Sequence, residues 1–144
     1  MNKDGIIIIN GPNLNLLGKR EPEVYGSTSF VDFYEELKEN YAHISLDHFQ
    51  SNHEGELISK IQEVGFSDVG IILNPAGYSH TSVALADAVA AVESPVVEVH
   101  ISNIFSREEF RKHSFISPVS AGVITGFGLK GYELAIKFLL EQNG

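Results

Sequence analysis

Hydrophobic runs alternate with amphipathic segments along the whole chain. Gly5–Asn10 (GIIIIN) and Val69–Leu73 (VGIIL) are apolar runs with no polar face, which is the pattern of strands buried on both sides of a sheet. Val96–Ile101, which follows Pro95, and Gly122–Thr125 are two further strand candidates. His43–Phe49 alternates more clearly between apolar and polar residues, and this predicts an edge strand.

Helical patterns separate these strands. Ser27–Tyr41 places its aromatic and leucine side chains on one stripe, and Ser27 is the expected N-cap. A second helix is expected to start after Ser51 or Asn52 and to end at Gly65. The remaining predicted helices are Thr81–Val92, a short one near Arg107–His113, and Leu129–Glu141. Thr81–Val92 is apolar nearly all round, so it is either buried or faces another subunit.

The alternation of strands and helices predicts an α/β fold in one domain spanning residues 1–144, with a parallel sheet covered on both faces. The two most apolar strands, the first and third, belong in the centre. This favours a flavodoxin-like sheet of five strands in the order 2-1-3-4-5. Ligands of such sheets bind at the carboxyl ends of the strands, beside the switch point between strands one and three.

The connection after the first strand is unusually long. Residues 11–26 separate the strand from the next helix, whereas strand-to-helix loops ordinarily have about 2–6 residues. The connection carries Arg20, Tyr25 and glycines that could act as hinges. It is either a mobile lid or a decorated surface loop.

Arg20 and Tyr25 could act together in that connection. A free tyrosine is a poor base at neutral pH. Two charges about 4 Å apart at an effective dielectric of 20 interact by roughly 4 kcal/mol, so a close guanidinium would favour the tyrosinate form. The spacing of these residues permits such a contact without requiring it.

Two histidines lie at or just after the carboxyl ends of predicted strands. Glu98 and His100 point to the same face of their strand, and a carboxylate beside an imidazole prepares it as a general acid. The alternative is a buried polar pair with no chemical role. His80 lies beside a predicted helix start, either as an acid or hydrogen-bond donor or as a surface histidine near a Ser/Thr cap.

Charge and composition exclude or disfavour several kinds of ligand and chemistry. The net charge of −9 disfavours nucleic acid as a partner, and the absence of cysteine excludes disulfides and thiolate chemistry. There is no metal-binding motif. Because the chain has only three arginines, each is a stronger candidate than usual for work at a site. No apolar stretch reaches the roughly 20 residues that a bilayer needs, and the N-terminus reads as a strand, so we expect a cytoplasmic protein.

One glycine motif is misleading. Gly126–Gly131 matches the GxGxxG pattern of dinucleotide-binding folds. Such a fold needs a further strand and an acidic residue about 20 positions on, and too little chain remains. We therefore expect these glycines to serve a tight turn and close helix packing.

Taken together, the motifs resemble one family. They are Asn10-Gly-Pro-Asn-Leu-Asn15, Arg20-Glu-Pro-x-x-Tyr25-Gly, Asn74-Pro-Ala-Gly-Tyr-Ser-His80-Thr-Ser, Glu98-Val-His100-Ile-Ser-Asn103, Arg107-Glu-Glu-Phe-Arg111-x-His-Ser and the terminal Gly-x-Gly-x-x-Gly-Tyr. They span nearly the whole chain in order, and the chain is similar to the type II 3-dehydroquinate dehydratases.

The resemblance implies a dehydratase that converts 3-dehydroquinate to 3-dehydroshikimate by syn elimination through an enolate, with no metal or organic cofactor. By matching position, Tyr25 is the base, Arg20 holds it as tyrosinate, and His100, oriented by Glu98, protonates the departing hydroxyl. The resemblance also implies residues that bind the substrate or a water. Asn13 positions a water at the enolate oxygen, and Asn74 and the backbone N–H groups of Ile101 and Ser102 hold the carboxylate. His80 and Arg111 hold ring hydroxyls, and Asp87 reaches in from a neighbouring subunit. Trimers assembled into dodecamers are implied as well.

A flavodoxin-like fold is also compatible with two other functions. A flavodoxin-like module that binds FMN or phosphate would need a hydroxyl-rich loop after the first strand, but Asn10–Asn15 has no hydroxyl residue and its N–H donors are interrupted at Pro12. A receiver-type signalling domain would need acidic residues where Asn10 and Asn74 stand.

Overall fold

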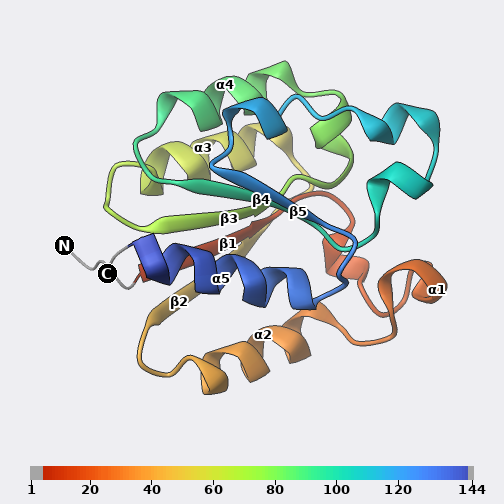
Figure 1. The fold of residues 1–144 in the computed structure, drawn as a ribbon, viewed down its shortest axis with the longest axis horizontal. Coiled ribbons are helices and arrows are strands. Elements are labelled where there is room, and N and C mark those ends of the chain that lie inside the picture. Colours follow the sequence, from red (N-terminus) through yellow and green to blue (C-terminus); the bar gives the residue numbers. More distant parts are fainter. Residues whose placement is uncertain (1–4, 143–144) are drawn as a thin grey trace.

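The computed structural model describes residues 5–142, which form a parallel sheet of five strands in the order β2-β1-β3-β4-β5 (Figure 1). The strands are β1 (Gly5–Asn10), β2 (Ser45–Gln50), β3 (Gly70–Asn74), β4 (Val96–His100) and β5 (Gly122–Thr125). The longer helices are α2 (Phe30–Asn40), α3 (Glu54–Val64), α4 (Val83–Ala91) and α5 (Lys130–Gln142). The flavodoxin-like order predicted from the sequence is therefore confirmed. Residues 1–4, 143 and 144 of the predicted domain lie outside the described residues.

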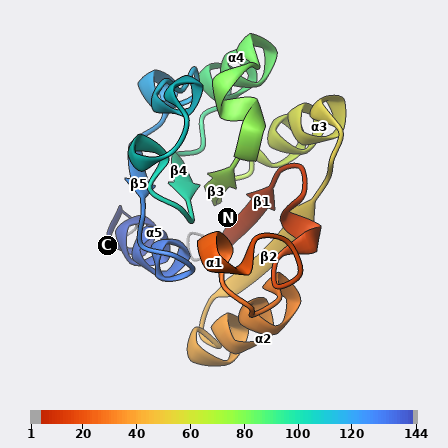
Figure 2. The same ribbon diagram turned by 90° about the vertical axis from the view of Figure 1, so that its right-hand side faces the viewer.

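Successive side chains of β1 enter opposite halves of the core. Ile6 and Ile8 pack in the cluster beneath α2 and α5, and Ile7 and Ile9 pack in the cluster beneath α3 and α4. All four are at most 6% exposed. Figure 2 shows these two helix pairs on opposite sides of the sheet. Burial on both faces explains why β1 is a run of isoleucines with no alternation.

The helix starts differ from those expected. Ser29, and not Ser27, caps α2 by accepting a hydrogen bond from the Asp32 N–H at 3.2 Å. This start places Phe30, which is 4% exposed, in the first turn against the core. The N-cap of α3 is His53, while Ser51 accepts a hydrogen bond from the His53 N–H at 2.9 Å.

The predicted short helix at Arg107–His113 is a 3₁₀ turn, η4 (Glu109–Lys112). None of its residues is buried, so no apolar face packs against the sheet to extend the turn into an α-helix. Two neighbouring turns of the same kind complete this part of the chain: η3 (Ile104–Ser106) and η5 (Ser117–Val119).

The GxGxxG glycines serve the β5–α5 turn, as expected. Gly126 and Gly128 have φ angles of 96° and 61°, a region that L residues rarely adopt. A Cβ on Gly131 would lie 3.3 Å from the side chains of Val99 and Ile124, so its absence lets α5 approach the sheet closely. In the described part of the chain no strand follows this turn.

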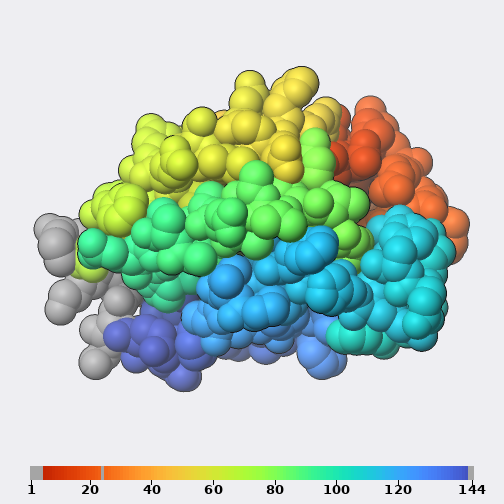
Figure 3. All heavy atoms as spheres, turned by 90° about the horizontal axis from the view of Figure 1, so that it is seen from above, coloured from red at the N-terminus to blue at the C-terminus, as the bar shows by residue number. Residues whose placement is uncertain are grey.

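The long connection after β1 lies at the carboxyl end of the sheet. It contains a 3₁₀ turn, η1 (Leu14–Leu16), and a single helical turn, α1 (Pro22–Tyr25). Gly11 begins it with a hydrogen bond from its N–H to the Asn74 carbonyl at 2.8 Å, and a Cβ there would lie 2.7 Å from the Pro75 oxygen. Viewed onto α3 and α4, this connection (orange) and the segment after β4 (teal) meet at one end of the molecule (Figure 3).

Within residues 5–142, no helix combines the length and the apolar character needed to cross a bilayer.

Candidate active site

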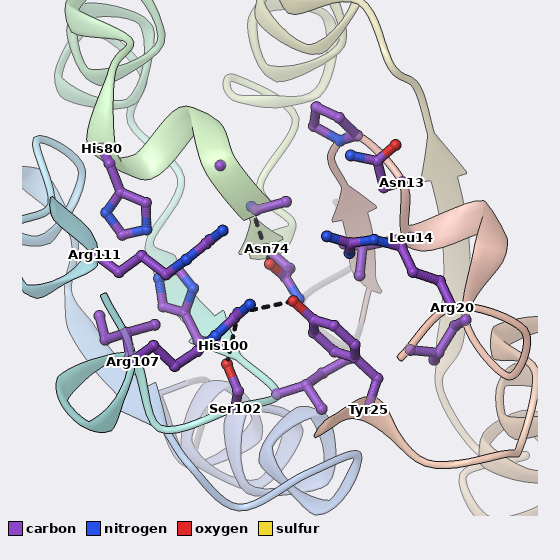
Figure 4. A pocket seen from close by; sticks show the side chains of 16 residues that line it. Asn13, Leu14, Arg20, Tyr25, Asn74, His80, His100, Ser102, Arg107 and Arg111 are labelled. Atoms are coloured by element: carbon purple, nitrogen blue, oxygen red, sulfur yellow. Dashed lines mark hydrogen bonds between the residues drawn. The ribbon is translucent and has the colours of Figure 1, made fainter. Parts of the chain in front are cut away.

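A cavity opens between the carboxyl ends of β1, β3 and β4 and the connection after β1 (Figure 4). This is the switch-point position predicted from the strand order. Of the residues expected at a site, nine line it: Asn13, Arg20, Tyr25, Asn74, His80, His100, Ile101, Ser102 and Arg111. The Tyr25 loop and His100 therefore face one cavity, which the proposed acid–base pairing requires.

Tyr25 ends α1 and points its hydroxyl into the cavity (Figure 4). The hydroxyl accepts a hydrogen bond from Arg107 Nη1 at 2.8 Å, and Arg107 also donates to Ser102 Oγ at 3.3 Å. The guanidinium carbons of Arg20 and Arg107 lie 5.4 and 5.5 Å from the Tyr25 ring centroid. Two positive charges therefore lie close to the Tyr25 side chain.

The sequence named Arg20 as the partner of Tyr25, and the geometry gives the hydroxyl contact to Arg107. Arg20 lies over the ring instead, and its Nη2 pairs with Glu21 Oε2 at 3.3 Å. The Arg20 side chain is 39% exposed, whereas that of Arg107 is 15% exposed. Arg107 had been singled out only by the scarcity of arginine, because 82 positions separate it from Tyr25 and no local spacing links the two.

Glu98 and His100 are in contact on β4. His100 Nε2 lies 2.6 Å from Glu98 Oε2, and the two residues are 5% and 0% exposed. Glu98 also accepts hydrogen bonds from Ser114 Oγ at 2.8 Å and from Ser117 Oγ. Burial opposes ionisation of Glu98, but the hydrogen bonds from His100 and the two serines outweigh it and lower the pKa of the carboxyl group.

An ionised Glu98 determines which ring nitrogen of His100 carries the hydrogen that faces it. The carboxylate accepts from Nε2–H, which leaves Nδ1 as the ring nitrogen available to a ligand. The buried carboxylate therefore holds the ring in one orientation, as a proton donor at a site needs. Glu98 itself lies behind the ring and does not line the cavity.

His80 is held in a turn, η2 (Ala76–His80), on the wall opposite Tyr25 (Figure 4). Its Nδ1 lies 2.7 Å from the His113 carbonyl oxygen, so Nδ1 carries the hydrogen and Nε2 is free to accept. Burial lowers the pKa of His80, and the nearby His100 and Arg111 add to this, against the raising effect of the His113 bond. Arg111 is positioned by Glu108, whose Oε1 accepts from Nε at 2.9 Å.

The floor of the cavity offers hydrogen-bond donors. The Asn74 side chain is 3% exposed and lies at the end of β3. Among the residues that the structure describes, no hydrogen bond is donated by the backbone N–H groups of Ile101 and Ser102. Such donors beside arginines suit a carboxylate. Asn13 adopts a left-handed conformation (φ 71°) at the cavity rim, where its N–H donates to Asn52 Oδ1 at 3.0 Å.

All three arginines of the chain line this one cavity. The protein as a whole is acidic, with a net charge of −9, so the cavity is positive against a negative background. Such a cavity favours a small anionic ligand. Within residues 5–142 no cluster of three or more His, Asp or Glu side chains could hold a metal ion.

Asp87 lies outside the cavity, on the exposed side of α4. It therefore has no place in the site of its own subunit, and its predicted reach into a neighbouring site stays a prediction.

Sequence reasoning also missed Leu17, Ala76, Gly77 and Ile104, which line the cavity. They are small or apolar residues and carry no chemical signal that a motif search could detect.

Comparison with known proteins gives a consistent result. A model of the family described as dehydroquinase class II matches residues 4–140. The chain is 51% identical over 140 residues to the 3-dehydroquinate dehydratase of Bacillus subtilis, covering 96% of this chain and 95% of that protein. It is 54% identical over 143 residues to the enzyme of the same name from Polynucleobacter asymbioticus, covering 97% and 96%.

Solved structures give the same answer. The type II dehydroquinase from Propionibacterium acnes superposes with a TM-score of 0.92 at 41% identity, covering 96% of this chain and 97% of that one. The type II dehydroquinase from Butyrivibrio crossotus gives a TM-score of 0.88 at 47% identity, covering 94% and 96%.

Proposed function

The chain belongs to the class II dehydroquinase family and is a 3-dehydroquinate dehydratase of the shikimate pathway, and we propose that Tyr25 and His100 carry its chemistry. The observation that supports this most strongly is the single cavity that receives both the arginine-bonded Tyr25 hydroxyl and the Glu98-bonded His100 ring. The FMN or phosphate module considered from the sequence is not favoured, because relatives along nearly the full chain carry the dehydratase name.

The proposed reaction is an elimination of water through an enolate. Tyr25, as tyrosinate, takes the proton beside the ketone, and the electrons of the broken C–H bond pass into the enolate. Arg107 and Arg20 stabilise the tyrosinate before it takes this proton. The enolate then expels the hydroxyl group, which leaves as water with a proton from His100. One proton passes from the substrate to Tyr25 and one from His100 to the product water. Solvent then takes a proton from Tyr25 and returns one to His100, which resets the site for the next turnover.

The remaining cavity residues are proposed to bind the substrate. Asn74 and the N–H groups of Ile101 and Ser102 hold the carboxylate, and His80 and Arg111 hold ring hydroxyls. Asn13 positions a water at the enolate oxygen, where a donor lowers the barrier because negative charge develops there.

The direct test is to add 3-dehydroquinate and follow the conjugated enone product by its ultraviolet absorbance. We expect turnover by the wild-type protein. Tyr25→Phe should abolish it while binding is largely kept, since the substitution removes the base and leaves the carboxylate donors in place. Tyr41→Phe, which lies outside the cavity, is the matched control. Well-folded wild-type protein that produces no enone would remove the assignment.

We further propose that the protein assembles into trimers, themselves assembled into dodecamers. The exposed residues of α4 form an apolar stripe, Val83, Ala84, Ala90 and Ala91, with Asp87 in its middle. A neighbouring copy would cover the stripe and receive Asp87 at its own cavity. Asp87→Ala and Tyr25→Phe should each be inactive alone, and their mixture should regain activity after dissociation and reassembly. No recovery in mixed oligomers of confirmed composition would contradict a shared site.

A cytoplasmic location is proposed as well. The substrate carries a carboxylate, and moving an unpaired carboxylate into hydrocarbon is very costly, so the enzyme is expected where the substrate is made. Cell fractionation followed by the enone assay tests this, and activity confined to a membrane or secreted fraction would contradict it.

A further inference from the structure

Tyr132 is a fully buried tyrosine whose hydroxyl lies beneath the active-site floor. It stands in the first turn of α5, directly after the glycine turn, and is 0% exposed. Its ring packs edge-on against Phe30, with centroids 5.2 Å apart. Burial raises the pKa of Tyr132 far above its ordinary value, so the group is a neutral hydroxyl with one hydrogen to donate.

The Tyr132 hydroxyl joins the ends of the two central strands. It accepts a hydrogen bond from Asn74 Nδ2 and donates one to Asn10 Oδ1, both at 2.9 Å. Asn10 and Asn74 are paired residues at the ends of β1 and β3, and they are 0% and 3% exposed. Asn10 Nδ2 in turn lies 3.3 Å from His48 Nε2 on β2.

The hydrogen bonds that link Ala76, Asn74, Tyr132 and Asn10 all run from donor to acceptor in the same direction. The Ala76 N–H donates to Asn74 Oδ1 at 3.1 Å, Asn74 donates to Tyr132, and Tyr132 donates to Asn10. The hydroxyl hydrogen is committed to Asn10, so its oxygen must accept, and only the Nδ2 end of the Asn74 amide can donate to it. The two ends of the amide are thereby distinguished.

The fixed amide has a consequence in the cavity. Asn74 Nδ2 carries a second hydrogen, for which no acceptor is found among the described residues, and the side chain lines the cavity. An amide turned the other way would present an oxygen to the substrate, and that oxygen would repel a carboxylate. The orientation therefore decides whether Asn74 attracts or repels an anion.

We propose that Tyr132, supported by Asn10, is a positioning residue that fixes the Asn74 amide so that it donates a hydrogen bond to an anionic oxygen of the substrate. The identity of that oxygen rests on the proposed function, in which it belongs to the carboxylate of 3-dehydroquinate.

The test is a double-mutant cycle on KM with Tyr132→Phe, Asn74→Ala and the double variant. A hydrogen bond to a charged group is worth a factor of about 10 to 100 in binding, so Tyr132→Phe should raise KM roughly tenfold or more, with kcat within about threefold of wild type. In the Asn74→Ala background the same substitution should change KM less than about twofold, because the group it positions is gone.

Tyr34→Phe is the matched control. This substitution also removes a hydrogen bond, which the Tyr34 hydroxyl donates to the Leu46 carbonyl oxygen at 2.8 Å, but Tyr34 lies outside the cavity. It should lower the melting temperature without moving KM. If Tyr132→Phe does not fold, Asn10→Ala serves as the second variant, because it removes the acceptor that fixes the hydroxyl. It should raise KM in the same direction, and only when Asn74 is present.

An unchanged KM for a folded Tyr132→Phe or Asn10→Ala variant would overturn the proposal, as would an equal increase with and without Asn74. Either result, obtained with an active wild-type enzyme, leaves the dehydratase function intact. Absence of enone formation by the wild-type enzyme would instead overturn the dehydratase function and, with it, this assignment of the Asn74 ligand.

Discussion

Replacing Arg107 with methionine removes the cation that contacts the Tyr25 hydroxyl and keeps most of the apolar stem. Two unit charges about 4 Å apart at an effective dielectric of 20 attract by about 4 kcal/mol, and a tenfold change in rate corresponds to about 1.4 kcal/mol. Complete loss of this attraction would lower the rate by almost a thousandfold. The Arg107 side chain is 15% exposed, so some screening remains. We expect Arg107→Met to lower kcat/KM by about a hundredfold.

Arg20→Met is the matched comparison, because Arg20 is equally near the ring but differently placed. Its guanidinium faces the ring, pairs with Glu21 at 3.3 Å, and belongs to a side chain that is 39% exposed. In surroundings this close to water, a pair at such distances contributes about 1 kcal/mol or less. Arg20→Met should therefore lower kcat/KM by less than about fivefold.

The assay is the rate of enone formation by wild type and both variants, with circular dichroism to confirm folding. A larger loss of kcat/KM for Arg20→Met would refute the reasoning from the hydroxyl contact and restore the partner inferred from the sequence. An unchanged kcat/KM in both variants would show that neither guanidinium supports the chemistry of Tyr25.

Three further outcomes are expected. Glu98→Gln keeps the size of the side chain but removes the carboxylate that orients His100, so kcat should fall about hundredfold or more at similar KM; a kcat near wild type would contradict the orienting role. Hydrogen bonds lower the pKa of Glu98 in the folded protein, so its contribution to the free energy of unfolding is present above roughly pH 4.3 and is lost as the pH falls further. Burial lowers the pKa of His48, so the free energy of unfolding should also decline as the pH falls below about 6.5. Melting temperatures measured across pH check both. His48→Gln should reduce the upper decline and leave the lower one, and the part of the upper decline that remains is expected from His80, whose pKa burial also lowers. Gly11→Ala should shift the connection after β1, since its Cβ would meet the Pro75 oxygen at 2.7 Å; an unchanged KM and melting temperature would show that the connection relaxes freely.

The sheet could be predicted from the sequence because burial leaves a direct mark on composition. β1 and β3 are inner strands, and every residue of both is buried, so they appear as unbroken apolar runs. The helix ends were harder to predict. Ser27 and Ser29 both have the chemistry of a cap, and what selects Ser29 is the position of Phe30 against the core, which depends on tertiary packing.

The site could be predicted where its partners are close in sequence. Glu98 and His100 are two residues apart on one strand, and strand geometry alone places them together. Arg107 and Tyr25 meet only because a turn after β4 and a loop after β1 end at the same edge of the sheet. Tyr132 was noticed only as the last residue of a motif, because nothing local shows that its hydroxyl reaches Asn10 and Asn74.

The acidic side chains around the cavity determine which arginine serves Tyr25. Arg20 and Arg111 each have a carboxylate close by, Glu21 at 3.3 Å and Glu108 at 2.9 Å, and these neutralise much of their charge. Arg107 has only longer contacts to the same two glutamates, at 4.0 and 3.8 Å, and its shortest bond is to the Tyr25 hydroxyl. Since attraction falls with distance and with competing anions, the least compensated cation is the one in contact with the phenol. Arg20 and Arg111 are then left as weaker charges at the cavity wall.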